Sequence, residues 1–476
     1  MKKSWISWFC IVAILGSLLG ASCGAEPSVS GGSTAIEQND GKWFMSKTAE
    51  YKETEKGTPL PVYTRYYDQL GGADVMPIGT YSGPTFDFLT EERFLEFKEV
   101  GFNIFTNSFS FNQNWESAEK LFELSNKHGF GVFANDSSIG DKAQANVITS
   151  QKIDERIQKY LQYESFLGVY LVDEPNAKGC VDYGKIMEQW KQSNIASNYD
   201  MYYNALPDYA TGTQLSGNST PITYEEYVRT YIEEMRADYF SYDYYPFGFN
   251  EGIADGYFGN LAVVRNICQE YEIPFWVFGQ CGFDFGWQVG INAPNEGQFI
   301  WGINTALAYG AKGVQYFVLN QPTGFINEND PWAATRAGMY GIYGNKNQWW
   351  YYAKKANAFI KNVDHVLMNS AHVGVIFHGD SPIKKTDGLE RIEQENFRQM
   401  TSVQGDDALI GCFDYYGGTA LLLVNNNVKK KDAKIILTFD DIYGYEVYQR
   451  DTQTEIAGNA LQLRLDQGEA ALVVLK

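Results

Sequence analysis

Two adjacent carboxylates, Asp173 and Glu174, stand where a short apolar run of the sequence ends, and Pro175 follows them. The run over residues 167–172 has the length and composition of a β-strand that is buried on both faces. An acidic pair at the carboxyl end of such a strand lies where a parallel β/α barrel carries its chemistry. Because a carboxyl group that aromatic side chains partly shield from water can stay protonated, the sequence predicts a general acid at Glu174.

The same pair also fits a structural role, in which Asp173 caps the following helix and Pro175 occupies its first turn. Caps of this kind are common in proteins. We favour the chemical role, since the pair falls at the end of the expected strand where barrel chemistry is concentrated.

Other expected strands end in amides, phenols and carboxylates. Such residues stand at Tyr81, Asn107, Asn135, Asp136, Asn204, Tyr242, Asp243, Tyr245, Gln280, Gln315 and Tyr316, with Trp287 after the seventh strand. The chain has four histidines and only His128 precedes His365, so a Ser-His-Asp triad or a histidine metal site is not expected. No glycine-rich phosphate loop stands at a strand–helix turn. The sequence therefore implies no metal and no organic cofactor.

Carboxylates, amides and aromatic rings in one cleft are the groups needed to break a glycosidic bond. In that reaction a carboxylic acid protonates the leaving oxygen, and a second group attacks the anomeric carbon or activates water. Aromatic residues make up 16% of the chain, and their flat apolar faces suit sugar rings. We expect Glu174 to be the acid, Asp243 or Asp173 to be its partner, and a carbohydrate to be bound by Tyr81, Asn107, Asn135, Asn204, Tyr242, Gln280, Trp287 and Tyr316.

The positions of these residues depend on an alternation of strands and helices that begins near Val75. Apolar runs predict strands at residues 75–80, 102–105, 130–134, 167–172, 201–203, 239–245, 274–278 and 313–319. Between them, acidic first turns, glycine stops and a capping box at residues 223–226 indicate helices. Eight strands alternating with helices over this length predict a (β/α)8 TIM barrel, an α/β fold.

The pattern of the sequence changes after about His365. Short apolar segments separated by Gly, Asn and Asp follow one another, and Leu461, Leu463 and Leu465 alternate with polar residues as in a strand with one wet face. We therefore expect the barrel domain over residues 41–364 and a small all-β sandwich over residues 365–476.

The first 23 residues have the features of an export signal, with Lys2 and Lys3 ahead of an apolar stretch. Small residues precede Cys23 and a polar tether over residues 24–40 follows it, which predicts lipidation of Cys23; an ordinary secretory signal with an incidental cysteine is the alternative. The expected location is the cell envelope, with a lipid anchor in the membrane. A formal net charge of −20 argues against nucleic acid as a partner, and no protein partner is evident from the sequence.

Five short segments carry a resemblance to a known family. They are Pro-Ile-Gly-Thr-Tyr at residues 77–81, Gly-Phe-Asn at 101–103, Gly-Val-Tyr-Leu-Val-Asp-Glu-Pro at 168–175, Ala-Leu-Ala-Tyr-Gly-Ala-Lys-Gly-Val-Gln-Tyr-Phe at 306–317, and Gln-Gly-Glu at 467–469. With them the chain resembles bacterial clan-A-type glycoside hydrolases that carry a C-terminal β-sandwich, from about Val75 to the C-terminus. The resemblance implies a TIM barrel with an acid/base glutamate at the end of the fourth strand, which is Glu174.

Two positions depart from that family. The family has Asn before the acid, where this chain has Asp173, and a nucleophilic Glu at the end of the seventh strand, where this chain has Gln280. An amide cannot act as a carboxylate nucleophile, so the standard pair of glutamates is not supported.

Three arrangements could supply the second group. Asp243 would be a nucleophile if it lies close to Glu174, and a base for an inverting water if it lies farther away. Asp173 beside Glu174 is also similar to hexosaminidases and chitinases, in which the acetamido group of the substrate attacks and the Asp steadies it. Glu296 is the third candidate, although it fits a first-turn helix charge better. Asp243 could equally be a buried acceptor for tyrosine hydroxyls.

Two functions of other classes remain compatible with the sequence. One is a non-catalytic, lipid-anchored glycan-binding protein on a barrel that has lost its nucleophile, which Gln280 favours. The other is a structural cell-surface protein, which would leave the tyrosine-rich strand ends without a purpose.

Overall fold

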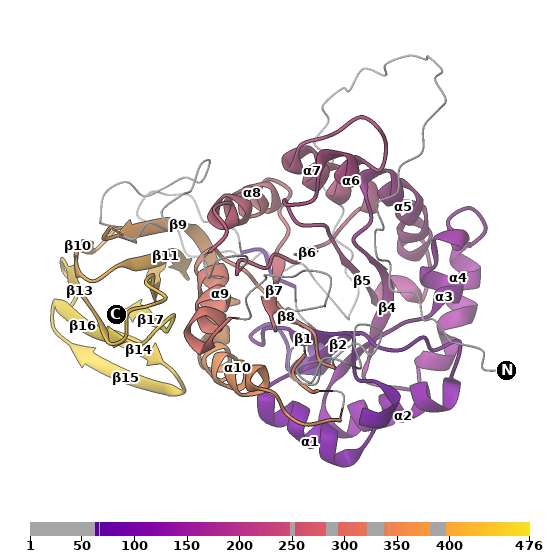
Figure 1. Cartoon of the computed structure of the whole chain (residues 1–476), viewed down its shortest axis with the longest axis horizontal. Coiled ribbons are helices and arrows are strands. Elements are labelled where there is room, and N and C mark those ends of the chain that lie inside the picture. Colours follow the sequence, from indigo (N-terminus) through magenta and orange to yellow (C-terminus); the bar gives the residue numbers. More distant parts are fainter. Residues whose placement is uncertain are drawn as a thin grey trace, which may run out of the picture. The chain divides into compact units, whose positions relative to one another are not determined.

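Eight parallel strands form the nearly closed barrel of the computed structural model, which describes residues 62–65, 67–247, 253–281, 294–320, 338–341, 343–380 and 397–476 (Figure 1). The strands are β1 (Ile78–Tyr81), β2 (Ile104–Asn107), β3 (Gly131–Ala134), β4 (Phe166–Asp173), β5 (Asp200–Asn204), β6 (Phe240–Tyr242), β7 (Phe275–Gln280) and β8 (Val314–Phe317). Their order in the sheet follows the chain from β1 to β5, and β8, β7 and β6 continue on the other side of β1. The ring closes where the Ala205 N–H donates to the Ser241 carbonyl at 2.8 Å. The predicted TIM barrel is confirmed.

Helices surround the barrel (Figure 1). They are α1 (Glu91–Val100), α2 (Trp115–His128), α3 (Ser137–Gly140), α4 (Ser150–Ile157), α5 (Ala177–Lys191), α6 (Gly212–Ser216), α7 (Tyr224–Met235), α8 (Tyr257–Glu270), α9 (Glu296–Ala308) and α10 (Gln348–Leu367), with 3-10 turns at Asp68–Leu70, Phe86–Phe88, Lys142–Gln144, Gln158–Tyr160 and Ala196–Asn198. The capping box predicted for α7 pairs Thr223 with Glu226, and Asn295 with Gln298 makes a second one at α9. Within the described ranges, no helix is both long and apolar enough to cross a membrane.

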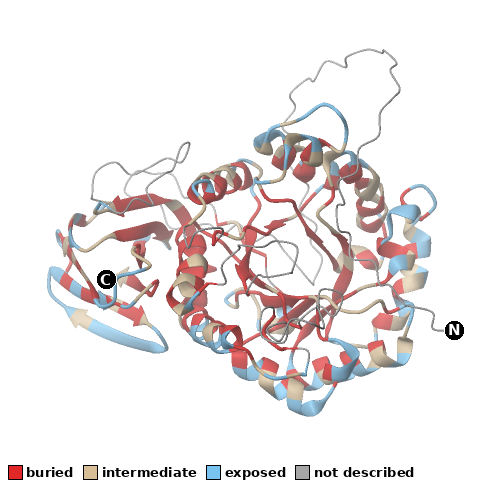
Figure 2. Cartoon of the chain, viewed as in Figure 1, coloured by how far each residue is buried: buried red, intermediate tan, exposed pale blue. Residues whose placement is uncertain are grey.

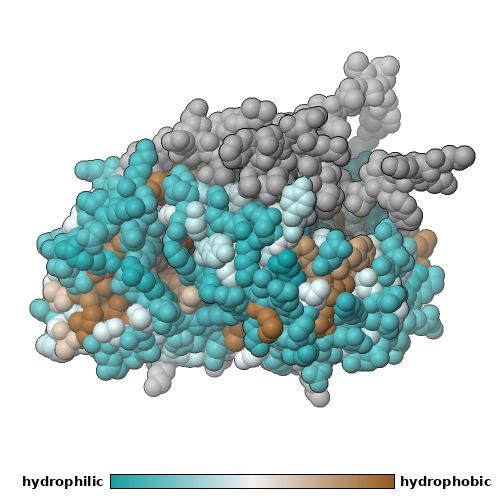
Figure 3. Space-filling view, turned by 60° about the horizontal axis from the view of Figure 1, so that its bottom comes forward, coloured by the Kyte–Doolittle hydropathy of each residue, from teal (hydrophilic) through white to brown (hydrophobic). Residues whose placement is uncertain are grey.

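The barrel strands are almost entirely buried, whereas the helices expose their outer faces (Figure 2). Side chains of a strand point alternately into the barrel and toward the helices, because successive residues lie on opposite faces of a sheet. The face of the molecule drawn in Figure 3 is mostly hydrophilic. The alternation of side chains along each strand decides which of the polar residues at the strand ends can meet inside the barrel.

Two antiparallel sheets follow the barrel. Their strands are β9 (Ser370–His378), β10 (Met400–Gly405), β11 (Ala408–Tyr415), β12 (Gly418–Asn425), β13 (Ala433–Phe439), β14 (Gly444–Gln449), β15 (Thr452–Ala457), β16 (Ala460–Leu465) and β17 (Ala470–Leu475). The sheets have the orders β15-β14-β17-β12-β11-β9 and β10-β13-β16, and an apolar core that includes Val403, Leu423, Leu437 and Leu463 fills the space between them. The predicted β-sandwich is confirmed. Strands β10 and β15 were not expected, and β15 is almost wholly exposed (Figure 2), so it has no apolar alternation to reveal it.

The other face of the six-stranded sheet packs on the barrel helices. Arg265 of α8 donates to the backbone oxygen of His372, at the start of β9, at 3.1 Å. Gly411 of β11 lies so close to Ala308 of α9 that a β-carbon at this position would overlap the Ala308 carbonyl. The barrel and the sheet share one hydrophobic core, to which the sheet contributes Leu409, Phe413, Ala420, Leu422, Val424 and Leu472.

Residues that precede β1 close the amino end of the barrel. The Tyr67 ring packs edge-on against Phe133 of β3 and Trp276 of β7, with centroid distances of 6.0 and 6.3 Å. Asp200, the first residue of β5, accepts hydrogen bonds from Arg65 Nε at 2.6 Å and from the Tyr67 hydroxyl at 2.7 Å. The side chains of Arg65 and Asp200 are each only 2% exposed, so this ion pair is buried in the barrel floor.

Candidate active site

Three strands bring polar groups together at the carboxyl end of the barrel. Asn204, at the end of β5, donates from Nδ2 to Asp173 Oδ1 of β4 at 3.2 Å and to Asp243 Oδ1, just after β6, at 2.9 Å. The nitrogen has two hydrogens, so it serves both acceptors at once, and the two oxygens lie within about 6 Å of each other. Asn204 is 3% exposed and Asp243 is 6% exposed. The structure therefore brings together three of the predicted site residues.

Glu174 reaches the same cluster through an unusual backbone conformation. Its φ angle is 47°, in the left-handed region that residues other than glycine rarely adopt, and its N–H donates to the Asn204 carbonyl at 2.9 Å. The Glu174 side chain hydrogen-bonds to Asp243 and lowers the pKa of that carboxyl group. A hydrogen bond between two carboxyl groups needs a proton on one of them, so Glu174 and Asp243 hold at least one proton between them when the bond forms. A general acid needs such a proton.

The helix-capping role considered for Asp173 is wrong. The N-cap of α5 is Asn176, whose side-chain oxygen accepts from the Gly179 N–H at 2.8 Å. Asp173 lies three residues earlier, inside β4, where it accepts from Asn204 instead. The carboxylate is thus held in the site.

Burial dominates the electrostatics of the two aspartates. It raises the pKa of Asp243 to about 7, with a further upward contribution from the charge of Asp173, against hydrogen bonds from Asn204 and Glu174. Burial also raises the pKa of Asp173, against hydrogen bonds from Tyr81 and Asn204. Both groups therefore hold a proton at a pH at which an exposed aspartate is ionised.

Replacement of Asp243 by Asn is expected to stabilise the fold at alkaline pH. The pKa of Asp243 in the folded protein, about 7, lies above the value near 4 of an unfolded aspartate. This group therefore has no unfavourable effect below about pH 4, and it lowers the free energy of unfolding progressively as the pH rises to about 7. We expect Asp243→Asn to raise the free energy of unfolding at pH 8 by on the order of 2 kcal/mol, and to change it little at pH 4.

Urea denaturation at the two pH values measures this difference. The exposed Asp255, replaced by Asn, is the matched control and should behave like the wild type at both. An Asp243→Asn protein whose gain in stability is the same at pH 4 and pH 8 would show that Asp243 ionises normally in the fold.

Aromatic side chains form the wall beside Asp173. The hydroxyls of Tyr81 and Tyr170 lie 2.9 Å apart, and the Tyr81 ring packs 5.9 Å from the rings of both Phe278 and Phe317. Tyr81, a predicted binding residue, hydrogen-bonds through its side chain to Asp173. Tyr170 belongs to the same wall, although the sequence did not single it out. Tyr170 stands in the middle of an apolar strand. Its place in the wall could be recognised only by knowing which face of that strand points into the barrel.

One aromatic residue near the acids is open to solvent. Tyr209, in the segment that follows β5, is 56% exposed, and its ring lies 5.3 Å from that of Tyr244. Desolvation at its hydroxyl raises the pKa of Tyr209 even though much of the side chain is exposed, and the charges of Asp243 and Glu174 raise it further. A large exposed ring within electrostatic reach of the acids is a surface on which a sugar could stack.

Asn107 and Asn135 lie together at the ends of β2 and β3. Asn135 Nδ2 donates to Asn107 Oδ1 at 2.9 Å and to the Ser108 carbonyl at 3.2 Å. Asp136 caps α3 and accepts from the Tyr160 hydroxyl at 2.7 Å, so its role is structural. The two asparagines stand at the same end of the barrel as the carboxylates.

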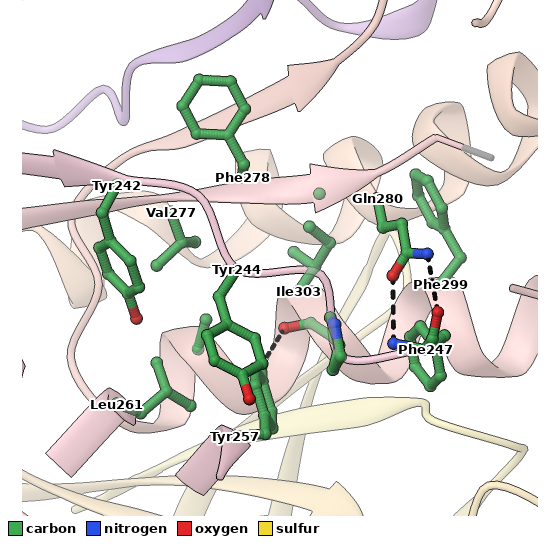
Figure 4. A pocket seen from close by; sticks show the side chains of 14 residues that line it. Tyr242, Tyr244, Phe247, Tyr257, Leu261, Val277, Phe278, Gln280, Phe299 and Ile303 are labelled. Carbon is green, nitrogen blue, oxygen red and sulfur yellow. Dashed lines mark hydrogen bonds between the residues drawn. The ribbon is translucent and has the colours of Figure 1, made fainter. Parts of the chain in front are cut away.

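Three residues predicted to bind substrate lie behind the sheet instead, which is a correction. Tyr242 and Gln280 line a cavity between strands β6 and β7 and helices α8 and α9 (Figure 4). Gln280 donates to the Phe247 carbonyl at 3.1 Å and accepts from the Phe247 N–H at 3.2 Å. The Tyr316 hydroxyl donates to Asn357 of α10 at 2.6 Å. Tyr242 and Tyr316 occupy strand positions that face the helices, whereas the Gln280 side chain, at the very end of β7, is held by the Phe247 backbone.

Of the remaining predicted residues, the structure describes Glu296 but not Trp287 or Cys23. Glu296 begins α9 and forms an ion pair with Lys355, as expected of a first-turn charge. Trp287 and Cys23 lie outside the described residues, and the roles assigned to them remain predictions. In the part of the chain that the structure describes, no group of three His, Cys, Asp or Glu side chains could hold a metal ion.

Similarity to solved structures is found at the level of the fold. A β-galactosidase from Bacillus circulans sp. alkalophilus aligns with a TM-score of 0.52 and 9% identity, over 84% of this chain and 99% of that one. A β-galactosidase from the psychrophilic Marinomonas ef1 aligns with a TM-score of 0.46 and 11% identity over 63% of each chain, so this chain spans less than two thirds of that protein. A family 30 subfamily 8 xylanase from Clostridium acetobutylicum gives 0.44 and 10%, over 84% of this chain and 96% of that one.

No protein-family model and no curated protein matches the sequence. The alignment with the Bacillus circulans β-galactosidase, at 9% identity, shows a shared fold and nothing finer. The chemistry of this chain has to be argued from its own residues.

Proposed function

We propose that the protein is a glycoside hydrolase that cleaves O-glycosidic bonds of an oligo- or polysaccharide, with Glu174 as the general acid. The observation that supports this most is the meeting of three carboxyl groups at the carboxyl end of the barrel, in which Glu174 hydrogen-bonds to Asp243 and Asn204 bridges Asp243 and Asp173. A protonated carboxyl beside an ionisable one is the arrangement that glycoside cleavage requires.

The spacing of the carboxyl groups favours retention of the anomeric configuration. Groups that share a hydrogen bond, as Glu174 and Asp243 do, leave no space for the water of an inverting reaction, which needs about 6.5–9.5 Å between carboxyls. Asp243 is then the nucleophile, or else Asp173 steadies an acetamido group of the substrate that attacks in its place. Cleavage of only those substrates that carry a 2-acetamido group would favour Asp173, and cleavage of plain hexosides would favour Asp243.

A non-catalytic glycan-binding protein is the second candidate. It is favoured by Gln280, which ends β7 with an amide whose oxygen and nitrogen are both engaged by the Phe247 backbone. A barrel that has lost its seventh-strand carboxylate could keep its sugar-binding surface and have no turnover.

Reducing-sugar release from β-glucans, galactans, mannans and N-acetylhexosamine polymers decides between the two. Wild type is assayed beside Glu174→Gln, with Glu92→Gln on the exposed side of α1 as the matched control. Release that is lost in Glu174→Gln and kept in Glu92→Gln supports the hydrolase. Binding to one polymer without release by the wild type would favour the glycan-binding protein.

Tyr209→Ala is expected to raise KM for an oligosaccharide about tenfold and to leave kcat nearly unchanged. Loss of one stacking ring removes binding that the ground state and the transition state share, on the order of 1 kcal/mol. Tyr351 on α10 is 53% exposed, close to the 56% of Tyr209, so Tyr351→Ala is the control and should leave both constants as they are. A lower kcat at unchanged KM would instead place Tyr209 among the groups that act in the transition state.

A further inference from the structure

A chain of hydrogen bonds runs beneath the carboxylate cluster. Ser241 Oγ of β6 donates to Asn204 Oδ1 at 3.1 Å, and the Tyr202 hydroxyl of β5 lies 3.1 Å from the same Ser241 oxygen. Ser241 has one hydroxyl hydrogen, which Asn204 receives, so Tyr202 is the donor in the second bond. Tyr202 and Ser241 are fully buried, and Asn204 nearly so.

These hydrogen bonds run in one direction, from Tyr202 through Ser241 to Asn204. It brings a donor to the carbonyl side of the Asn204 amide, and the opposite side faces two carboxylates. A flipped amide would present its oxygen to Asp173 and Asp243, so Asn204 could no longer donate to either group in its charged form. The loss matters in a buried site, because water does not replace the missing donor.

Alternation along the strands explains why these residues meet. Ser241 and Asp243 are two residues apart, as are Tyr202 and Asn204, so each pair points to the same side of its strand. Neighbouring strands therefore contribute two layers: an upper one that carries Asp243 and Asn204, and a lower one that carries Ser241 and Tyr202.

We propose that Ser241 is a positioning residue, which accepts from Tyr202 and donates to Asn204 and thereby locks the Asn204 amide so that it holds Asp173 and Asp243 in their reactive arrangement. The inference rests on the proposed hydrolase function for its kinetic consequences. Its electrostatic consequences concern the two aspartates themselves and do not depend on turnover.

The groups around the two aspartates determine the expected effect. Besides burial, the charge of Asp173 raises the pKa of Asp243, Glu174 hydrogen-bonds to Asp243, and Tyr81 hydrogen-bonds to Asp173. Besides burial, the charges of the two aspartates in turn contribute to raising the pKa values of the surrounding phenols, which are those of Tyr81, Tyr170, Tyr202, Tyr209, Tyr224 and Tyr245. The Asn204 N–H groups stabilise the charged forms and so lower the pKa of both Asp173 and Asp243. When Ser241 no longer holds the amide, these bonds weaken and both pKa values rise.

Ser241→Ala is expected to move the acidic limb of the kcat/KM profile upward by about one pH unit and to lower kcat about tenfold near neutral pH, with little change in KM. Ser165→Ala is the matched control, since Ser165 is a buried serine whose hydroxyl donates to the Phe122 carbonyl far from the cluster. An acidic limb at the wild-type position in Ser241→Ala would overturn the proposal, even if kcat falls.

A second variant keeps the proposal testable if Ser241→Ala does not fold. Tyr202→Phe removes the donor to Ser241 and leaves the Ser241 hydroxyl in place, so a smaller shift in the same direction is expected. Tyr239→Phe is its control, because the buried Tyr239 hydroxyl donates to the Met201 carbonyl instead. Equal profiles for the two phenylalanine variants would contradict the proposal.

Carbon-13 NMR titration of protein labelled at the aspartate carboxyl carbon separates this inference from the proposed function. The resonance that is missing in Asp243→Asn identifies Asp243, and its midpoint should rise by about one pH unit in Ser241→Ala. An unchanged midpoint would refute the positioning role. A shifted midpoint in a protein that cleaves no glycan would uphold that role and refute the hydrolase.

Discussion

Glu174→Gln is expected to lower kcat on a natural glycan by about a thousandfold, because the leaving oxygen then has no proton donor. The variant keeps the shape of the side chain, and glutamine at this position meets the same backbone requirement as glutamate at φ 47°. The amide can still donate to Asp243, so the cluster stays assembled. The loss therefore measures proton transfer rather than collapse of the site.

The dependence of this loss on the leaving group gives a sharper test. Aryl glycosides whose phenol is acidic leave without protonation, so Glu174→Gln should act on them with a kcat/KM within about tenfold of the wild type, since kcat/KM reports the step that releases the phenol. Equal losses of kcat/KM on the glycan and on the activated aryl glycoside would mean that Glu174 is not the acid. The circular dichroism spectrum and the denaturation midpoint should match those of the wild type.

Asp200→Asn is expected to lower the free energy of unfolding by about 3 kcal/mol, because it breaks a buried ion pair. Asp200 accepts from both Arg65 and Tyr67 in the barrel floor, where neither member of the ion pair has access to water. Removal of the carboxylate leaves the Arg65 charge buried, with Asp238 Oδ2 at 3.8 Å as a remaining acidic contact.

Urea denaturation at pH 7 measures this effect against an exposed ion pair. Arg229 Nη1 and Glu270 Oε1 are 2.7 Å apart, but the Glu270 side chain is 58% exposed, so Glu270→Gln should cost less than about 1 kcal/mol. Similar midpoints for Asp200→Asn and Glu270→Gln would mean that water reaches the barrel floor. The activity of Asp200→Asn at low temperature should stay near that of the wild type, because the floor lies at the opposite end of the barrel from Glu174.

The sequence is most informative where local physics agrees with the fold. The capping box at residues 223–226 predicted the start of α7, and the apolar run before Asp173 predicted β4. The acidic pair at the end of that strand is the strongest signal of the site, and Asp243 meets it at the end of β6. These features depend on neighbours in the chain, which the sequence displays directly.

The errors come from the choice of strand face. Tyr316 and Tyr242 stand at strand ends as expected, but the alternation turns them toward the helices, Tyr316 toward α10 and Tyr242 into the cavity beside α8 and α9. Ser241 was overlooked because a serine within an apolar run resembles a core residue, although its two-residue spacing from Asp243 was visible. Which face of each strand points into a barrel depends on the register between strands, and this register is set by contacts distant in the sequence.

The contact between Gly411 and Ala308 restricts how this protein could be rebuilt. Because no side chain fits at position 411, where β11 meets α9, the sandwich is not an exchangeable module like an accessory domain on a linker. A barrel transplanted without its own sandwich would expose the apolar surface that Leu409, Phe413 and Leu422 now cover. Recombination between related chains would therefore succeed only when both sides of this contact are inherited together.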